Sequence, residues 1–254
     1  MPVPYLCPIM KRNLFYIAII LSIGFACQTD RRNIKDYYYP VLDLQKGSVY
    51  GYELNVNGQK TTDYWYLMGF ARDSGLFLAS TNYDNQFQIN QIVREKMTEN
   101  GAIARSYYVY EQDSATQKAI QTEAVLKSPD IFPFSVKDSL GVFLFSLYYN
   151  PMNEIQSKIY LIRNRRYLGD GPDFEWNGKK YATIRMGIRE AIGNEGEGAA
   201  EIEGVGEEWY AKGIGLVYFK KKYGDKGALI REYRLKEIIS MDELIQRAGA
   251  QWKG

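Results

Sequence analysis

The sequence contains no histidine and only two cysteines, and these shortages limit the chemistry available to the protein. Without histidine, Ser-His-Asp and Cys-His arrangements are impossible, and so are the common zinc sites with imidazole ligands. Carboxylate, lysine and tyrosine chemistry remains, so a glycosidase-like or hard-cation site is compatible with the composition. We expect a protein that is not an enzyme and that uses no metal and no cofactor.

A net charge of one sign is also missing. The chain has 32 Lys and Arg against 30 Asp and Glu, and without Lys11 and Arg12 the two kinds of charge are equal in number. A neutral chain offers no electrostatic footprint for nucleic acid, which we exclude as a partner. The hydrophobic content of 46% is that of a globular protein with a core of its own.

The N-terminal region has the anatomy of an export signal. Lys11 and Arg12 precede an apolar run, Leu14–Ala26, of about 13 residues, which is the length of a signal core and short of the roughly 20 residues that span a bilayer. Residues 1–9 have no charge and three prolines, which fits neither a helix nor the leading end of a signal. We interpret residues 1–26 as a signal peptide whose true start is Met10.

The end of the apolar run, "SIGFAC" from Ser22 to Cys27, resembles the lipobox of bacterial lipoproteins. In that family the cysteine is acylated and becomes the mature N-terminus; here Gly24 stands where Leu is usual, and Phe25 is bulkier than usual. Cys7 would be removed with the signal, so Cys27 has no partner for an intrachain disulfide. The resemblance implies lipidation at Cys27, for example with palmitate, and anchoring of the protein to a membrane.

The residues after Cys27 bear on the location. In the Gram-negative scheme an aspartate at the next position commonly retains a lipoprotein in the inner membrane, whereas this chain has Gln28. The resemblance therefore implies a cell-envelope protein in the outer membrane, on its periplasmic or its surface face. We interpret residues 27–45 as the lipid anchor and a tether.

Residues 46–239 have the pattern of antiparallel β-strands. In "SVYGYELNVNG", apolar Tyr50, Tyr52 and Leu54 alternate with polar residues, and Asn57-Gly58 ends the run with a hairpin signal. The pairs Asn100-Gly101 and Asn177-Gly178 repeat that signal, and we interpret residues 86–97 as a strand rather than a helix. The predicted fold class is mainly β: a curved antiparallel sheet, half-barrel or barrel, with a β-sandwich as the alternative.

Residues 240–254 are predicted to form a C-terminal amphipathic helix. Ser240 and Glu243 have the spacing of a capping box, and the apolar residues that follow lie on one face. We expect this helix to cover apolar surface at an open end of the curved sheet.

Three segments resemble a known group of proteins. They are "LQKGSVYGYEL", "FEWNGKKYATIRM" and "EEWYAKGIGLVYFKKKYGDKGALIREYRLKEI". In this order they are similar to extracytoplasmic domains of unknown function from Gram-negative bacteria, which resemble the β half-barrels of periplasmic lipoprotein-handling proteins. The resemblance implies a sheet around an apolar cavity, and it supplies no catalytic residues.

Four further motifs are interpreted as structural. Residues 193–208 contain six glutamates and five glycines, which favours a solvated connection between strands, and residues 219–226 favour a basic hairpin tip. Residues 173–184 resemble a calcium loop but have Ile184 where the bidentate Glu belongs. Gly213 and Gly215 indicate a tight bend or a close backbone approach. Ligand-binding residues are left unassigned.

Three functions are compatible with these observations. The first is a membrane-anchored envelope lipoprotein that acts as a non-catalytic binding or assembly module for an apolar ligand, such as a lipid, or for an envelope protein. The second is a carbohydrate-binding or weakly hydrolytic surface protein that uses some of its 22 tyrosines and 4 tryptophans as platforms. The third is a purely structural envelope lipoprotein.

Overall fold

The computed structural model describes residues 31–113, 116, 118–137, 141–152, 157–195, 200–224 and 227–251. The predicted signal peptide, the predicted start Met10 and the predicted lipidation site Cys27 lie outside the described residues. The chain from Arg32 onwards is one compact unit.

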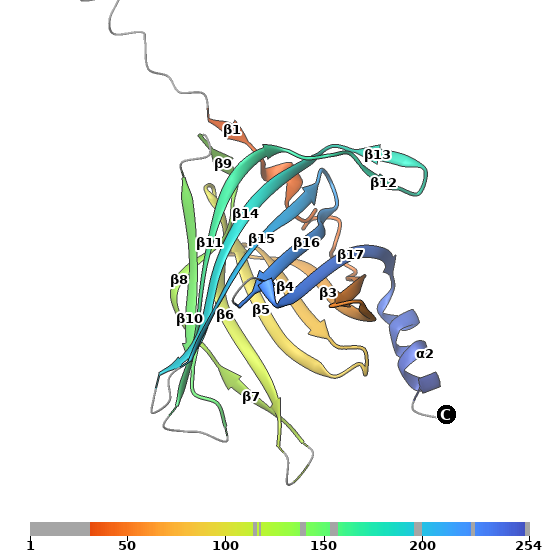
Figure 1. Cartoon of the computed structure of the whole chain (residues 1–254). Coiled ribbons are helices and arrows are strands. Elements are labelled where there is room, and N and C mark those ends of the chain that lie inside the picture. The colour runs from red at the N-terminus through yellow and green to blue at the C-terminus, as the bar shows by residue number, and fades with distance from the viewer. Residues whose placement is uncertain are drawn as a thin grey trace, which may run out of the picture. The chain divides into compact units, whose positions relative to one another are not determined.

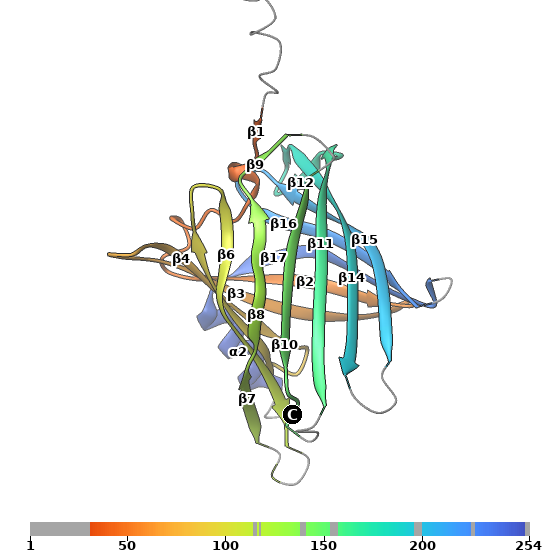
Figure 2. The same cartoon turned by 90° about the vertical axis from the view of Figure 1, so that its left-hand side faces the viewer.

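Within the described residues, twelve antiparallel strands form a closed ring. Figure 2 shows β8, β10, β11, β14 and β15 side by side in this order, and the pairing of β5 with β6 closes the ring. The order around the ring is β5 (Ile89–Met97), β4 (Gly75–Tyr83), β3 (Gln59–Arg72), β2 (Ser48–Val56), β17 (Leu229–Ile239), β16 (Gly215–Tyr223), β15 (Glu201–Ala211), β14 (Thr183–Glu195), β11 (Lys158–Asp170), β10 (Val142–Tyr149), β8 (Val125–Pro133) and β6 (Gly101–Gln112).

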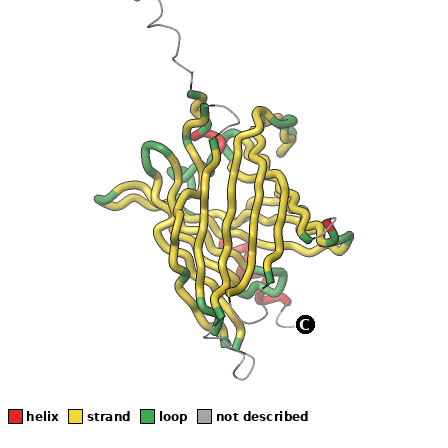
Figure 3. Tube along the Cα trace, turned by 60° about the vertical axis from the view of Figure 1, so that its left-hand side comes forward, coloured by secondary structure: helices red, strands yellow, loops and turns green. Residues whose placement is uncertain are grey.

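The short elements extend this ring. Strand β7 (Ala119–Glu123) continues the pairing along β6, while β12 (Phe174–Trp176) and β13 (Lys179–Tyr181) form a separate hairpin. Strand β1 (Arg32–Asn33) pairs with β9 (Ser135–Val136), and the 3-10 helix η1 is Lys35–Tyr37. Strands dominate the trace in Figure 3, so the predicted mainly β class is confirmed as a barrel, and the sandwich alternative is not found.

The predicted hairpins are present. Asn57 and Gly58 have φ of 49° and 97° between β2 and β3, and Asn177 and Gly178 have φ of 49° and 73° between β12 and β13. Both pairs have the two positive φ angles that tight hairpin turns require. Gly215 also has a positive φ, and a Cβ there would lie 2.3 Å from the ring of Tyr39, which explains the predicted bend.

One end of the barrel is filled by residues 34–47, which we call the plug segment. Ile34, Tyr38, Val41 and Leu44 are buried among inward side chains of the strands. Eight strands make a barrel that its own side chains can fill, and a wider ring leaves interior space that a plug can occupy. The predicted tether (27–45) is therefore wrong from Ile34 onwards, because this part of the chain belongs to the core.

The C-terminal helix α2 (Met241–Gln251) is confirmed, but its predicted place is wrong. Its buried Leu244 packs with Val49 and Tyr64, which lie on the outward faces of β2 and β3, so α2 covers the outer wall and not an open end (Figure 1). The predicted cap is present, since the Glu243 amide donates to Ser240 Oγ over 3.2 Å. The plug segment takes the role that we had expected of the helix.

Replacing Gly69 with alanine should displace the plug segment. A Cβ at Gly69 would lie 1.9 Å from the carbonyl oxygen of Val41, and the Gly69 amide donates to the carbonyl of Leu44 over 2.9 Å. We expect a loss of roughly 1–3 kcal/mol or more in the free energy of unfolding, measured by urea denaturation. Gly141→Ala is the control, because its Cβ would make only ordinary contacts of 3.6 Å. Equal urea midpoints for the two variants would contradict the proposed close contact.

Candidate functional site

The barrel contains a lumen with a cavity volume of about 550 Å³. Its lining combines apolar side chains such as Trp65 and Phe145 with buried charged side chains from β5, β11, β14, β15 and β16. The lumen therefore differs from the purely apolar cavity that the family resemblance implied. At the end away from the plug segment, Ile192 and Ile202, which lie on the inward face, are 37% and 53% exposed.

A first ion pair in the lumen joins β11 to β15. Arg165 Nε and Nη2 donate to the two carboxylate oxygens of Glu208 over 2.9 and 3.3 Å, and Nη1 donates to the carbonyl of Ile131 over 3.0 Å. The hydroxyl of Tyr210 also donates to Glu208 over 2.8 Å. Burial alone would raise the pKa of Glu208, but the pairing with Arg165 outweighs it and lowers that pKa.

A second cluster gathers around the buried Glu190 on β14. Its carboxylate accepts hydrogen bonds from Arg163 Nε on β11, from Lys221 Nζ (3.1 Å) and from the Tyr223 hydroxyl (2.7 Å), both on β16. Burial opposes ionisation of Glu190, yet these partners hold its pKa far below the usual range. Burial, reinforced by repulsion from Arg163, lowers the pKa of Lys221 to about 8.

Two glycines on the intervening strand β15 make this cluster possible. Gly204 on β15 is paired with Glu190 on β14 on one side and with Tyr223 on β16 on the other. Gly206 on β15 is paired with Lys221 on β16. A Cβ at Gly204 would lie 2.6 Å from the ring of Tyr223, and a Cβ at Gly206 would lie 3.0 Å from Lys221 Cγ. The side chains of Tyr223 and Lys221 therefore extend over Gly204 and Gly206 of β15 to reach Glu190.

These residues correct two sequence interpretations. Most of the predicted acidic connection (193–208) is strand, because β14 ends at Glu195 and β15 begins at Glu201, and its Glu208 is 3% exposed. The predicted basic hairpin tip (219–226) begins inside β16, where Lys221 is 7% exposed. The signal in the sequence was the two-residue spacing of Gly204, Gly206 and Glu208. In a strand this spacing places all three residues on one face, which is the inward face of β15.

A buried carboxyl links the lumen to the plug segment. The Tyr38 hydroxyl, from the plug segment, donates a hydrogen bond to Glu95 on β5. Burial raises the pKa of Glu95 to about 7, although the bond to Tyr38 and the charge of Arg165 act in the opposite direction. Glu95 therefore binds a proton more readily inside the fold than in the unfolded chain.

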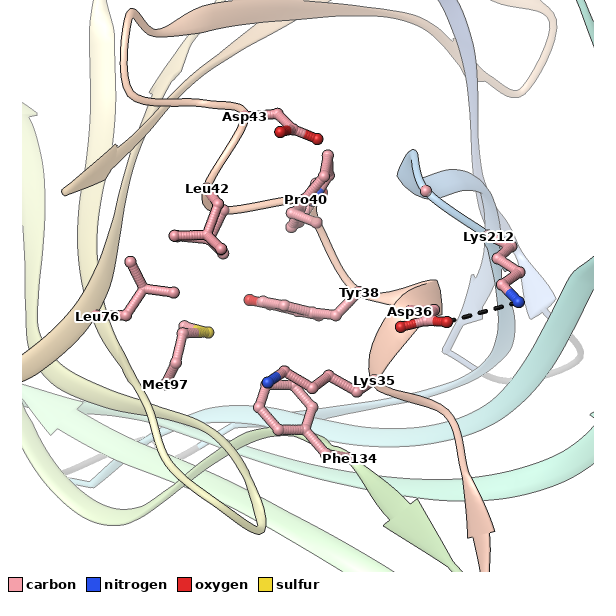
Figure 4. Close-up of a pocket in the computed structure, with 13 residues that line it drawn as sticks. Lys35, Asp36, Tyr38, Pro40, Leu42, Asp43, Leu76, Met97, Phe134 and Lys212 are labelled. Atoms are coloured by element: carbon pink, nitrogen blue, oxygen red, sulfur yellow. Dashed lines mark ion pairs between the residues drawn. The ribbon is translucent and has the colours of Figure 1, made fainter. Parts of the chain in front are cut away.

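On the other side of Tyr38 lies a second cavity of about 460 Å³, which we call the end pocket. Figure 4 shows Leu42, Leu76, Met97 and the Tyr38 ring pointing toward a common space, with Phe134 alongside. The ion pair between Asp36 and Lys212 (3.5 Å) lies on the far side of the plug segment from Leu76 and Met97. Tyr38 and Tyr39 line both cavities and form the wall between them.

The remaining predicted motifs are elsewhere in the fold. The calcium-like stretch (173–184) contains the β12–β13 hairpin, and Ile184 at its last position is fully buried. Among the described residues, no group of three or more Asp, Glu, Cys or His is placed to hold a metal ion. No helix in the described part of the chain is both long and apolar enough to span a membrane.

Comparison with solved structures finds similar chains. The chain is similar to a candidate exported protein with a YmcC-like fold from Bacteroides fragilis (TM-score 0.52, 13% identity, 79% of this chain and 98% of the other). It is also aligned with a candidate lipoprotein from Parabacteroides distasonis (TM-score 0.48, 10% identity, 80% and 97%). A third alignment is with the hypothetical lipoprotein YmcC from Escherichia coli (TM-score 0.35, 10% identity, 78% and 88%).

The likeness to the Bacteroides fragilis structure confirms the predicted resemblance at the level of the fold. No protein-family model matches the sequence, and no curated protein matches it.

The stability of the protein should depend on the charge of Glu95. Its pKa is about 7 in the folded protein and 4.5 ordinarily, so between these values the folded protein holds a proton that the unfolded chain has lost. The free energy of unfolding should therefore fall as pH rises through this window, by about 3 kcal/mol. In Glu95→Gln this contribution should be absent, while those of all other groups remain.

Urea denaturation of both proteins at about pH 5 and about pH 7.5 measures the difference. The other carboxylates titrate alike in both proteins. The difference between the two proteins in how the free energy of unfolding changes with pH is therefore the contribution of Glu95. If the free energy of unfolding changes with pH in Glu95→Gln as it does in the unmodified protein, the raised pKa of Glu95 is contradicted.

Proposed function

We propose that the protein is a cell-envelope lipoprotein, anchored in the outer membrane through Cys27, that binds a small apolar ligand in the end pocket and performs no catalysis. The observation that carries the binding proposal is the end pocket itself. Its volume of about 460 Å³ lies within the range of roughly 300–1,000 Å³ that is typical of ligand sites. The description of the Bacteroides fragilis neighbour as a candidate exported protein supports the envelope location.

The chemistry of the end pocket suits an apolar ligand such as an acyl chain. The apolar residues of the lining include Val41, Leu42, Leu76, Met97 and Phe134. Leu42 is 63% exposed, so an apolar ligand would remove it from water with a gain in free energy. Met97 has a flexible, polarisable side chain that adapts to ligands of different shape.

The end pocket also has charged residues in its lining. Lys212 and Asp36 are paired with each other over 3.5 Å, and Asp43 adds a further carboxylate. The Lys35 ammonium lies 5.5 Å from the centre of the Phe134 ring, at the edge of the apolar lining. A cation beside an apolar surface favours a ligand with a long apolar part and a polar end.

The carbohydrate alternative has less support from the lumen. A hydrolytic site needs a second, free carboxylate beside a carboxyl with a raised pKa, such as Glu95. Glu208 is held by Arg165, and Glu190 by Arg163 and Lys221, so neither is free for that role.

Leu42→Asp should weaken binding of an apolar ligand. Titration of the purified full chain with the neutral fluorescent probe N-phenyl-1-naphthylamine should give saturable binding, and the variant should bind about tenfold more weakly. Ile245→Asp is a matched control, because Ile245 on α2 is 60% exposed and lies outside the end pocket. Equal affinity in the two variants, or no saturable binding in the unmodified protein, would exclude the end pocket as the site.

Cys27→Ser should release the protein from the membrane. Expressed in a Gram-negative host with labelled palmitate, the unmodified protein should sediment with the outer membrane and carry the label. The Cys27→Ser variant should lose both properties, because acyl chains supply the anchor. Cys7→Ser should keep both, and persistence of label in Cys27→Ser would refute lipidation at this residue.

A further inference from the structure

The second cavity, in the lumen, has a chemistry different from that of the end pocket. Its charged side chains from β11, β14, β15 and β16 are Arg163, Arg165, Lys221, Glu190 and Glu208. Buried ion pairs of this kind contribute little net stability compared with apolar side chains of the same volume. The cluster therefore needs an explanation beyond the stability of the barrel.

The pair of Arg165 and Glu208 is balanced in charge. Each of the three guanidinium nitrogens of Arg165 donates a hydrogen bond, two to Glu208 and one to the carbonyl of Ile131. Three of the five N–H groups of Arg165 are used in this way, and its positive charge is matched by one carboxylate.

The cluster around Glu190 is different, because in the described residues one carboxylate faces two cations. Arg163 uses Nε alone for Glu190, and the Lys221 ammonium makes one hydrogen bond of the three it can donate. Among the described residues, no buried side-chain nitrogen or oxygen lacks a partner. The Nη atoms of Arg163 have no hydrogen-bond partner in the part of the chain that the structure describes, so they are accessible, and both cations line the lumen.

The surroundings of these donors can hold the rest of a small ligand. Asn82, Gln91 and Tyr107 offer further polar groups in the same cavity, and Phe145 and Leu161 offer apolar ones. A guanidinium with both terminal nitrogens open matches the geometry of a carboxylate or phosphate, and an ammonium beside it adds a second positive charge.

We propose that the lumen is a binding site for a small ligand with an oxyanion, a carboxylate or a phosphate, held by the Nη groups of Arg163 and the ammonium of Lys221. The anion supplies the negative charge that the cluster around Glu190 lacks. Gly204 and Gly206 serve the site by letting Tyr223 and Lys221, respectively, approach Glu190 across β15.

Calorimetric titration of the purified full chain tests this proposal. The probes are inorganic phosphate, acetate and monohexyl phosphate at neutral pH. Saturable binding of at least one probe is expected, with affinity reduced about tenfold or more in Lys221→Met because a charge-assisted hydrogen bond is lost. Lys222→Met is the matched control, because Lys222 is the next residue on β16 and faces outward. Binding in the control should equal that of the unmodified protein.

The three probes also distinguish two sources of the anion. Equal affinity for phosphate and monohexyl phosphate would assign the site to a free anion, and tighter binding of monohexyl phosphate would assign it to a lipid-type headgroup; both support the proposal. No saturable binding of any probe, or equal binding in Lys221→Met and the unmodified protein, would overturn it. Because the apolar probe of the end pocket is uncharged, failure here leaves that result unaffected.

A second measurement avoids any effect of the substitution on folding. Acetylation of the unmodified protein with an amine-reactive reagent, followed by peptide mass spectrometry, should show Lys221 protected by a saturating concentration of the probe that binds most tightly in the titration, and Lys222 unprotected. Equal labelling of Lys221 with and without that probe would overturn the proposal.

Discussion

The width of the barrel is the constraint on which the rest of the structure depends. A ring of eight strands is filled by its own inward side chains, and the twelve described strands enclose a wider space. That space is occupied in two ways. The plug segment crosses one end, with Tyr38 in the core, and the long charged side chains around Glu190 and Glu208 fill the middle. The end pocket and the lumen are the spaces that this filling leaves on either side of Tyr38.

The local features of the fold could be predicted from the sequence. The alternation in β2 and the tight turns at Asn57-Gly58 and Asn177-Gly178 depend only on residues close together in the chain. These turns require positive φ angles, which Asn and Gly adopt readily. The capped start of α2 at Ser240 is of the same kind. The place of α2 could not be predicted, since an apolar helix face fits an outer wall as well as an open end. Closure of the ring depends on the pairing of β5 with β6 and on the register of every strand between them.

The candidate sites could not be predicted for a related reason. Alternation along a strand separates two faces, but it does not say which face is inside when the interior is polar. In β15, Gly206 and Glu208 look like a solvated face, yet they lie on the inward side, where Glu208 meets Arg165. Most of the plug segment falls within the predicted tether (27–45), and its apolar residues have neither the period of a strand nor that of a helix. Its burial comes from contacts with residues far along the chain, such as Phe132 and Ile214.

The wall between the two cavities gives them a physical connection. The Tyr38 ring faces the end pocket, while its hydroxyl is bonded to Glu95, which lines the lumen (Figure 4). Arg165 acts on the charge of Glu95 from the other side and belongs to the same row of lumen side chains as Arg163. A change in the charge of the lumen therefore acts on the pKa of Glu95, the group that accepts the hydrogen bond from Tyr38. Tyr38 is also close-packed against Phe132, with ring centres 5.0 Å apart, so the side chain that separates the two cavities is held by a polar contact on the lumen side and by aromatic packing in the core.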